Sequence, residues 1–203
     1  MRLVVATRNE HKLGELAALL PEHDLTPLPD GVELPPETSE TFAANALGKA
    51  RAAAAATGAA AIADDSGIEA SALGGRPGVH SARYAGKAAS DEDNLAKLLA
   101  EVPAGGDRRV AYACALAYVD ADGEERVFEA RCEGILAEEP RGEHGFGYDP
   151  AFLPVDIPDG RTMAQLEPYE KDAISHRGRA ARALGDWLRS VRPGTAGGRE
   201  AGP

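Results

Sequence analysis

Two hydrophobic periods alternate through the first part of the chain. An apolar run at residues 3–6 predicts a short buried strand. Leucines at helical spacing over residues 13–20 predict a helix, which ends at a proline-rich segment, 21–36. That segment is typical of a connector, with one short strand at residues 25–28. The polar residues 7–12 then form the loop between the first strand and the first helix.

A second helix and a second strand follow the connector. Thr38 or Ser39 can cap the helix, which contains an alanine-rich stretch and ends at Gly58. A run of small apolar residues at 59–63 predicts a strand that leads into Asp-Asp-Ser-Gly at residues 64–67. The glycine of this motif predicts a sharp turn at the end of the strand.

The remaining pattern combines one helix, a hairpin, a loop-rich region and a last helix. Ser90 is a predicted helix cap, and the strand-like segments 110–119 and 126–135 are joined by a turn sequence. Residues 140–154 are rich in loop formers, and residues 171–191 have a helical apolar face. Helices that alternate with strands early, and a hairpin late, predict an α/β protein with a central mixed β-sheet flanked by helices.

Composition narrows the range of partners. The 203 residues include 22 Lys and Arg against 33 Asp and Glu, which gives a formal net charge of −11. An acidic chain repels phosphodiester backbones, so we expect no nucleic-acid partner, although a local cationic pocket can still bind a small anion. Cys114 and Cys132 are too few for a disulfide scaffold. We predict one domain over residues 1–192 and a flexible tail at 193–203.

The sequence also bears on location. It has no apolar run of about 18 residues, the length that a membrane-spanning helix needs, so we expect no membrane partner. The N-terminus begins directly with the first predicted strand and soon becomes charged, which does not fit a signal peptide. We therefore expect a cytoplasmic protein.

The loop at residues 7–12 is the first candidate site. It follows a strand and precedes a helix, which is where ligands and anions collect in α/β proteins. Thr7 and Asn9 supply short polar groups, and Lys12 supplies a positive charge at phosphate reach. The alternative is a polar loop in which Asn9 only caps the helix.

Asp64 and Asp65 form the second candidate site. Adjacent carboxylates repel each other unless one binds a divalent cation or accepts backbone N–H bonds. Neighbouring residues of an extended segment point to opposite sides, so we expect only one of the two in the site, with the other tying down the loop. The alternative is an Asx turn with both carboxylates in solvent.

Two aromatic residues form the third candidate site, within a glycine-containing segment at residues 145–150. Their rings can stack on a flat heterocycle while Asp149 accepts hydrogen bonds from its edge. The alternative is a hydrophobic plug beneath a loop.

A cationic segment near the start of the last predicted helix is the fourth candidate. Lys171, His176 and Arg177 lie there, with Ser175 between them. Cations at a helix start oppose the helix dipole, an arrangement that suits a phosphate-bearing ligand. The alternative is a solvated cationic surface.

Glu37 is the last candidate. It precedes Asn45 and Lys49, which are one helical turn apart and face the same way. Glu37 can complete a set of oxygen ligands for Mg²⁺. The alternative is an exposed, solvated glutamate, which is the commoner case.

Together these segments resemble the inosine triphosphate pyrophosphatase family, the noncanonical purine nucleoside triphosphate (dITP/XTP) pyrophosphatases. The matching segments are ATRNEHKLGEL, ETSETFAANALGKA, AIADDSGIEASALGGRPGVHSARYAG, GEHGFGYDPAF and EKDAISHRGRA. The resemblance extends from about Val4 to Leu188. It implies an enzyme that hydrolyses ITP, dITP and XTP to the monophosphate and pyrophosphate and so removes them from the nucleotide pool. It also implies Mg²⁺ as cofactor, a homodimer, and two lobes around a cleft.

The resemblance also assigns roles to individual residues. Asp65 matches the general base and a metal ligand, and Lys12 and Lys49 match catalytic cations. Glu37 matches a second metal ligand, with Glu33 as the alternative because the position of this acid varies among relatives. The implied substrate-binding residues are Thr7, Arg8, Asn9, Glu10, His11, Lys12, Ser66, Phe146, Gly147, Tyr148, Asp149, Lys171, His176 and Arg177.

Two other functions stay open at this point. One is a non-catalytic nucleotide sensor on the same fold, and the other is a pyrophosphatase for modified pyrimidine nucleotides. Intact Asp65, Lys12 and Lys49 argue against the sensor, and the aromatic segment favours a purine. No Ser-His-Asp arrangement is evident, so we expect direct attack by water without a covalent enzyme intermediate.

Overall fold

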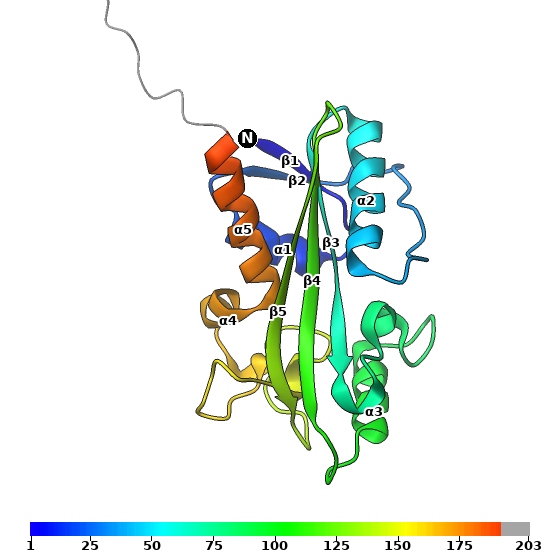
Figure 1. The fold of residues 1–203 in the computed structure, drawn as a ribbon, viewed down its shortest axis with the longest axis vertical. Coiled ribbons are helices and arrows are strands. Elements are labelled where there is room, and N and C mark those ends of the chain that lie inside the picture. The colour runs from blue at the N-terminus through cyan, green and yellow to red at the C-terminus, as the bar shows by residue number, and fades with distance from the viewer. Residues whose placement is uncertain (192–203) are drawn as a thin grey trace, which may run out of the picture.

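A six-stranded mixed sheet forms the centre of the protein in the computed structural model (Figure 1), which describes residues 1–191. The predicted tail at 193–203 lies outside these residues. The strand order is β2-β1-β3-β4-β5-β6, with β1 parallel to β2 and β3 and all later pairs antiparallel. The strands are β1 Arg2–Val5, β2 Asp24–Pro27, β3 Ala61–Ala70, β4 Arg109–Val119, β5 Glu125–Leu136 and β6 Phe152–Pro154.

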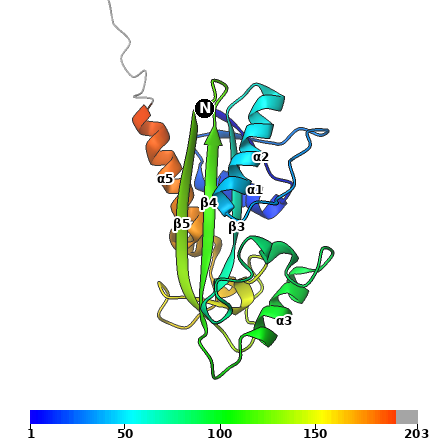
Figure 2. The same ribbon diagram turned by 45° about the vertical axis from the view of Figure 1, so that its right-hand side comes forward.

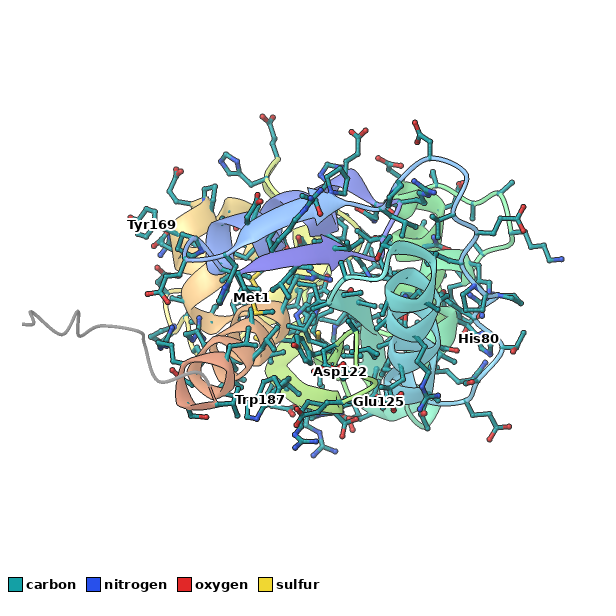
Figure 3. The ribbon with its side chains drawn as sticks, turned by 90° about the horizontal axis from the view of Figure 1, so that it is seen from above. Met1, His80, Asp122, Glu125, Tyr169 and Trp187 are labelled. Carbon is teal, nitrogen blue, oxygen red and sulfur yellow. The ribbon has the colours of Figure 1, made fainter. Side chains whose placement is uncertain are left out.

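Helices cover both faces of one half of the sheet. Figure 3 shows α2 and α5 on either side of the β4–β5 hairpin, and Figure 2 shows α3 at the other end of the long strands. The helices are α1 Glu10–Leu19, α2 Phe42–Thr57, α3 Asp91–Glu101, α4 Pro168–Ile174 and α5 His176–Val191. No helix within residues 1–191 is both long and apolar enough to cross a membrane.

Successive side chains of a strand point to opposite faces of the sheet. The core beside α2 and α5 therefore has two layers, one on each face. Val5 and Ile62 pack with α1 and α5, whereas Val4 and Ala63 pack with α2. Alanines line both sides of the α2 interface, so this helix lies close against the sheet. A separate core beneath α3 contains Ile68 and the residues around it, so the two lobes have separate cores. The prediction of an α/β fold with a central mixed sheet and two lobes is confirmed.

The prediction that β3 ends at the Asp-Asp-Ser-Gly motif is wrong. The strand continues to Ala70, and its whole length pairs with β4. Gly67 therefore lies within the strand rather than in a turn. A Cβ atom there would lie 2.4 Å from both the Gly78 carbonyl oxygen and Ser81 Oγ, so glycine is needed for the close approach of a neighbouring segment.

Other element boundaries also differ from the prediction. The cap of α2 is Thr41, whose side chain accepts a bond from Ala44 N, rather than Thr38 or Ser39. The predicted last helix is two helices, because Ser175 is extended and its Oγ accepts from Gly178 N as a cap does. The loop-rich region also contains β6, a short strand at the sheet edge. The predicted cap of α3 and the β4–β5 hairpin are confirmed.

Candidate active site

The candidate site lies where β3 passes between the two lobes. Asp64 and Asp65 sit in the middle of this strand and face opposite sides of the sheet, as predicted for an extended segment. Both carboxylates are buried, which excludes the solvated Asx turn. Asp64 pairs with Lys12 and Arg177, and Asp65 lies beside Lys49. The expectation that only one of the two acids faces the substrate, while the other ties down its surroundings, stays a prediction.

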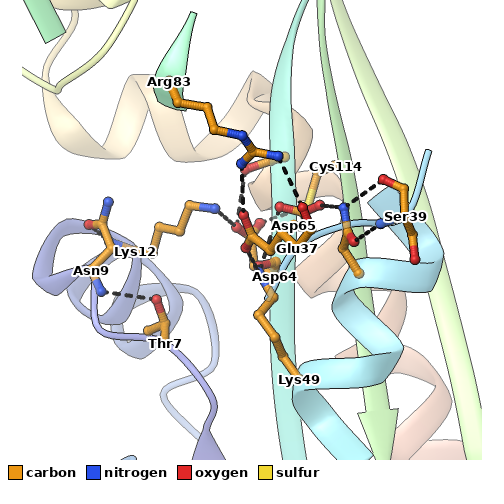
Figure 4. A network of polar contacts seen from close by, with 12 residues as sticks. Thr7, Asn9, Lys12, Glu37, Ser39, Lys49, Asp64, Asp65, Arg83 and Cys114 are labelled. Carbon is orange, nitrogen blue, oxygen red and sulfur yellow. Dashed lines mark hydrogen bonds and ion pairs between the residues drawn. The ribbon is translucent and has the colours of Figure 1, made fainter. Parts of the chain in front are cut away.

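The Asp65 face combines one ammonium group with several oxygens (Figure 4). Lys49 Nζ lies 2.6 Å from Glu37 Oε1, 2.7 Å from the Asp64 carbonyl oxygen and 3.6 Å from Asp65 Oδ1. Asn45 Nδ2 donates to Asp65 Oδ2 at 3.0 Å. Glu37 is thus the acid that reaches the site, whereas Glu33 is exposed. A cluster of oxygens around one positive group is the donor chemistry that a hard divalent cation needs.

Burial and charge set the protonation of this face. Burial raises the pKa of Asp65, and the nearby Glu37 carboxylate adds to that effect, although Lys49 opposes it. Burial alone would raise the pKa of Glu37, but the Lys49 ammonium outweighs it and lowers the pKa. Asp65 is therefore the carboxylate of this face that accepts a proton most readily.

The Asp64 face is a buried set of positive and donor groups. Arg177 donates to both carboxylate oxygens of Asp64, at 3.2 and 3.3 Å, and Lys12 Nζ pairs with Oδ1. Ser66 Oγ and Cys114 Sγ donate at 3.1 and 3.0 Å. Burial would raise the pKa of Asp64, but Arg177 and Lys12 outweigh it and hold the pKa well below its usual range.

Glu15 is a site residue that the sequence interpretation missed. It lies on α1, three residues after Lys12, and joins two cations from the other end of the chain. Its carboxylate accepts from Lys171 Nζ at 2.7 Å and from Arg177 Nη1 at 2.5 Å. Burial would raise its pKa, but Arg177 and Lys171 outweigh it and lower the pKa. The only signal was its helical spacing from Lys12, which many surface glutamates share.

The cations near the last helices are buried rather than solvated. Arg177 is 1% exposed and Lys171 is 7% exposed, so the solvated-surface alternative is wrong. Lys171 Nζ also donates to Asp149 Oδ2 at 2.7 Å. The helix is interrupted at Ser175, so that Arg177 on α5 reaches Asp64 while Lys171 on α4 reaches the aromatic loop.

The aromatic loop is held by its own aspartate. Asp149 accepts from Phe146 N at 3.0 Å and from Tyr112 Oη at 2.9 Å. Tyr148 is buried in the lower core, and its Oη donates to the Ser81 carbonyl oxygen, so the plug interpretation is correct for that ring. The Phe146 ring remains in the pocket, where it stacks on His11 with centroids 5.2 Å apart.

His176 presents a free nitrogen in this region. Its ring stacks on Tyr112 at 4.7 Å, and its Nδ1 is buried without a hydrogen-bond partner. Burial lowers its pKa well below the usual range, and the charge of Arg177 adds to this effect. The imidazole is therefore neutral at physiological pH.

The loop at residues 7–12 contributes unequally to the site. Asn9 caps α1 by accepting from Lys12 N, and Thr7 Oγ1 accepts from Asn9 N. Arg8 turns away, because its guanidinium donates to the carbonyl oxygens of Leu28, Pro29 and Val32. Glu10 is exposed in the first turn of α1.

One pocket brings most of the predicted residues together. It lies between the lobes and connects the polar β3 region to the aromatic loop. Of the predicted substrate-binding residues, Thr7, Arg8, Glu10 and His11 do not line it. The predicted residues that do are Asn9, Lys12, Ser66, Phe146, Gly147, Tyr148, Asp149, Lys171, His176 and Arg177.

Comparison with known proteins gives a consistent result. The chain matches the Ham1 family over residues 3–187. It is 48% identical to the dITP/XTP pyrophosphatase of Mycobacterium tuberculosis, over 95% of this chain and 98% of that protein. It is 50% identical to the dITP/XTP pyrophosphatase of Frankia alni, over 94% of this chain and 98% of that protein.

Solved structures agree with these sequence matches. The Staphylococcus aureus Ham1 protein superimposes with a TM-score of 0.83 and 38% identity, over 94% of this chain and all of that one. A nucleoside-triphosphatase / dITP/XTP pyrophosphatase from Mycobacterium abscessus gives 0.72 and 46%, over 91% of this chain and 98% of that one. The chain therefore belongs to the Ham1 family.

Proposed function

We propose that this protein is a Mg²⁺-dependent pyrophosphatase that hydrolyses ITP, dITP and XTP to the monophosphate and pyrophosphate. The observation that carries the proposal is one pocket between the lobes, in which cations for a polyphosphate adjoin an aromatic loop for a base. Relatives about half identical over nearly the whole chain bear the name dITP/XTP pyrophosphatase.

Glu37 and Asp65 are the proposed metal-binding residues. Magnesium is commonly held by one or two carboxylates and completes its shell with water and substrate phosphate. Within residues 1–191, no cluster of three or more His, Cys, Asp or Glu side chains is placed to hold a metal. Glu37 and Asp65 both flank Lys49 Nζ, at 2.6 and 3.6 Å, and would supply two of the oxygens, with phosphate and water supplying the rest. A Mg²⁺ ion held by these residues would supply positive charge to neutralise the phosphates.

The proposed reaction is direct hydrolysis between the α and β phosphates. A water oxygen bonds to the α phosphorus. At the same time the bond between the α phosphorus and the oxygen that bridges the α and β phosphates breaks, and pyrophosphate leaves with that bridging oxygen. Asp65 accepts the proton of the water, a role that suits a carboxylate with a raised pKa. Lys12 and Lys49 stabilise the negative charge that builds on the leaving pyrophosphate.

Discrimination against adenine follows from the donors that remain in the pocket. Phe146 N and Gly147 N are already bonded, to Asp149 and Asp91, so neither is available to a base. His176 lines the pocket, and its neutral imidazole carries one N–H, which can donate to the 6-oxo group of hypoxanthine or xanthine. Adenine presents an amino donor at that position and would leave this N–H without an acceptor.

A substrate panel tests this proposal. Pyrophosphate release would be measured from ITP, dITP, XTP, ATP, GTP and dUTP, with Mg²⁺ and with a chelator. We expect the three deaminated purines to exceed ATP by up to about 10⁴-fold in kcat/KM, and the chelator to abolish release. No release from any nucleotide would favour the sensor, and best release from dUTP would favour a pyrimidine enzyme.

Three further expectations stay predictions. These are a homodimer, which the resemblance implies, a cytoplasmic location, and a single domain over residues 1–192. Sedimentation of the purified protein tests the first of these directly.

A further inference from the structure

Arg83 connects the lobe that contains α3 to residues 33–41, which carry Glu37 of the proposed metal site. It is the last residue of the 3₁₀ segment η2, Gly78–Arg83. Its Nη2 donates to the Glu37 carbonyl oxygen at 3.0 Å, and its Nη1 lies 3.7 Å from Glu37 Oε2 (Figure 4). Residues 28–41 contain no helix or strand, so contacts such as these fix where Glu37 lies.

The two contacts with Glu37 differ in strength. The bond to the main-chain oxygen has the usual length of a hydrogen bond, whereas the carboxylate contact is longer than a hydrogen bond. The Glu37 carboxylate is instead closest to Lys49 Nζ, at 2.6 Å. Arg83 thus holds the backbone of Glu37 more closely than its carboxylate, which pairs with Lys49 on the Asp65 side of β3. Both side chains are 32% exposed, so a ligand can reach them from the cleft.

The segment that carries Arg83 is itself anchored to the rest of the site. Ser81 Oγ accepts from Ile68 N in β3 at 2.9 Å. The Ser81 carbonyl oxygen accepts from Tyr148 Oη of the aromatic loop at 2.7 Å. The position of Glu37 is therefore set relative to both the catalytic strand and the loop that faces the base.

We propose that Arg83 is a positioning residue, which holds Glu37 in place across the cleft so that its carboxylate can bind the metal together with Asp65. The proposal rests on the function proposed above. Without Arg83, residues 33–41 lose these contacts with the lobe that contains α3. A ligand acid that is no longer held in place binds its cation more weakly, and loss of such supporting contacts typically costs about 10- to 100-fold.

The test compares Arg83→Ala, Arg83→Lys and Arg76→Ala with wild type. Arg76 is a matched control, because it lies seven residues earlier, is exposed, and donates only to Leu73 O. Amide hydrogen exchange of residues 33–41 would be measured without nucleotide or metal. Hydrolysis of ITP would then be measured over a range of Mg²⁺ concentrations.

We expect faster exchange in residues 33–41 and an increase of about 10-fold or more in the Mg²⁺ concentration for half-maximal rate in Arg83→Ala. Arg83→Lys should fall between this variant and wild type, because one ammonium cannot serve both contacts. Arg76→Ala should match wild type in both measurements.

Three results would overturn the proposal. Unchanged exchange in Arg83→Ala would show that Arg83 does not hold the segment. Faster exchange with unchanged Mg²⁺ dependence would show that the segment's position does not matter to the reaction. Lost activity with unchanged exchange would make Arg83 a substrate contact instead. If wild-type protein fails to hydrolyse ITP, the proposed function is wrong, and exchange alone still shows whether Arg83 holds Glu37.

Discussion

Asp64 and Asp65 are neighbours in one strand, but their surroundings differ. Asp64 accepts bonds from Arg177, Lys12, Ser66 and Cys114, and its charge is balanced by two cations. Asp65 accepts one bond from Asn45 and lies 3.6 Å from an ammonium that is shared with other oxygens. One side of the strand therefore holds a fixed negative charge, whereas the other holds a carboxylate that can still exchange protons or bind a ligand.

This contrast assigns different work to the two acids. Asp64 lies in a buried chain of alternating charges, which runs through Arg177, Glu15 and Lys171 to Asp149. That chain fixes the cations of the pocket. Asp65 and Glu37 have fewer direct bonds and a more open side, as reacting or ligand-binding groups require. Variants of the two acids should consequently fail in different ways.

The largest effect is expected for Asp65→Asn. Its kcat/KM for ITP should fall by about 10²- to 10⁴-fold, because an amide cannot accept the proton of the attacking water. The fold should survive, because an amide oxygen can still accept from Asn45. Pyrophosphate release and circular dichroism would test both points, with the exposed Asp107→Asn as control. Near-normal turnover in Asp65→Asn would exclude Asp65 as the base.

Asp64→Asn should instead destabilise the protein. Arg177 would keep Glu15 but lose its other carboxylate while fully buried, and breaking a buried ion pair typically costs about 3–5 kcal/mol. Urea unfolding would measure the loss of unfolding free energy against wild type and Asp65→Asn. Equal stability of the two variants would contradict the difference in roles.

Much of the site, but less of its framework, could be predicted from the sequence. Asp65, Lys12 and Phe146 lie in short motifs whose local chemistry is evident. The length of β3 was not evident, because pairing with β4 overrides the turn tendency of Asp-Asp-Ser-Gly. Gly67 indicated a turn, but the structure requires glycine for close packing instead.

Residues that act over long sequence distances were also missed. Glu15 acts on residues about 160 positions later in the chain, and no local pattern shows such a pairing. No sequence pattern pointed to Arg83 either, because its partner Glu37 lies in a connector without regular structure. Arg8 was assigned to the substrate by motif, yet its guanidinium holds residues 28–32.

Glu15→Gln tests the role of the ion pairs on the Asp64 side of β3. Removing this charge leaves Lys171 and Arg177 with one carboxylate partner each, so both cations lose orientation in the pocket. A hydrogen bond to a charged group contributes about 1.5–3 kcal/mol, which corresponds to about 10- to 100-fold in KM for ITP.

Steady-state kinetics would separate this rise in KM from any change in kcat. Glu22→Gln provides the control, because Glu22 is exposed and pairs only with Arg189 at the surface. A fall in kcat with unchanged KM would instead place Glu15 in the chemical step and would break the proposed division between the two sides.

The smallest expected effect concerns pH. Asp65 must be ionised to act as a base, and burial raises its pKa in the metal-free protein, so kcat/KM, which reports the free enzyme, should fall with acid at a higher pH than for an exposed aspartate. Asp64 has a lowered pKa, so its stabilising contribution is present above the unfolded pKa and is lost only as pH falls through the folded pKa. Activity should therefore decline before the fold does.

Asn45→Ala tests whether Asp65 causes the fall of kcat/KM at low pH, the acid limb of the pH profile. The Asn45 amide donates to Asp65 and so lowers its pKa, and without it the limb should move toward higher pH. Thr57→Ala, at the far end of α2, is the control, because its hydroxyl bonds only within the helix and to the next turn. A limb that moves equally in both variants would arise from a change in the helix. A limb that moves only in Asn45→Ala would place the titrating proton on the Asp65 side of the strand.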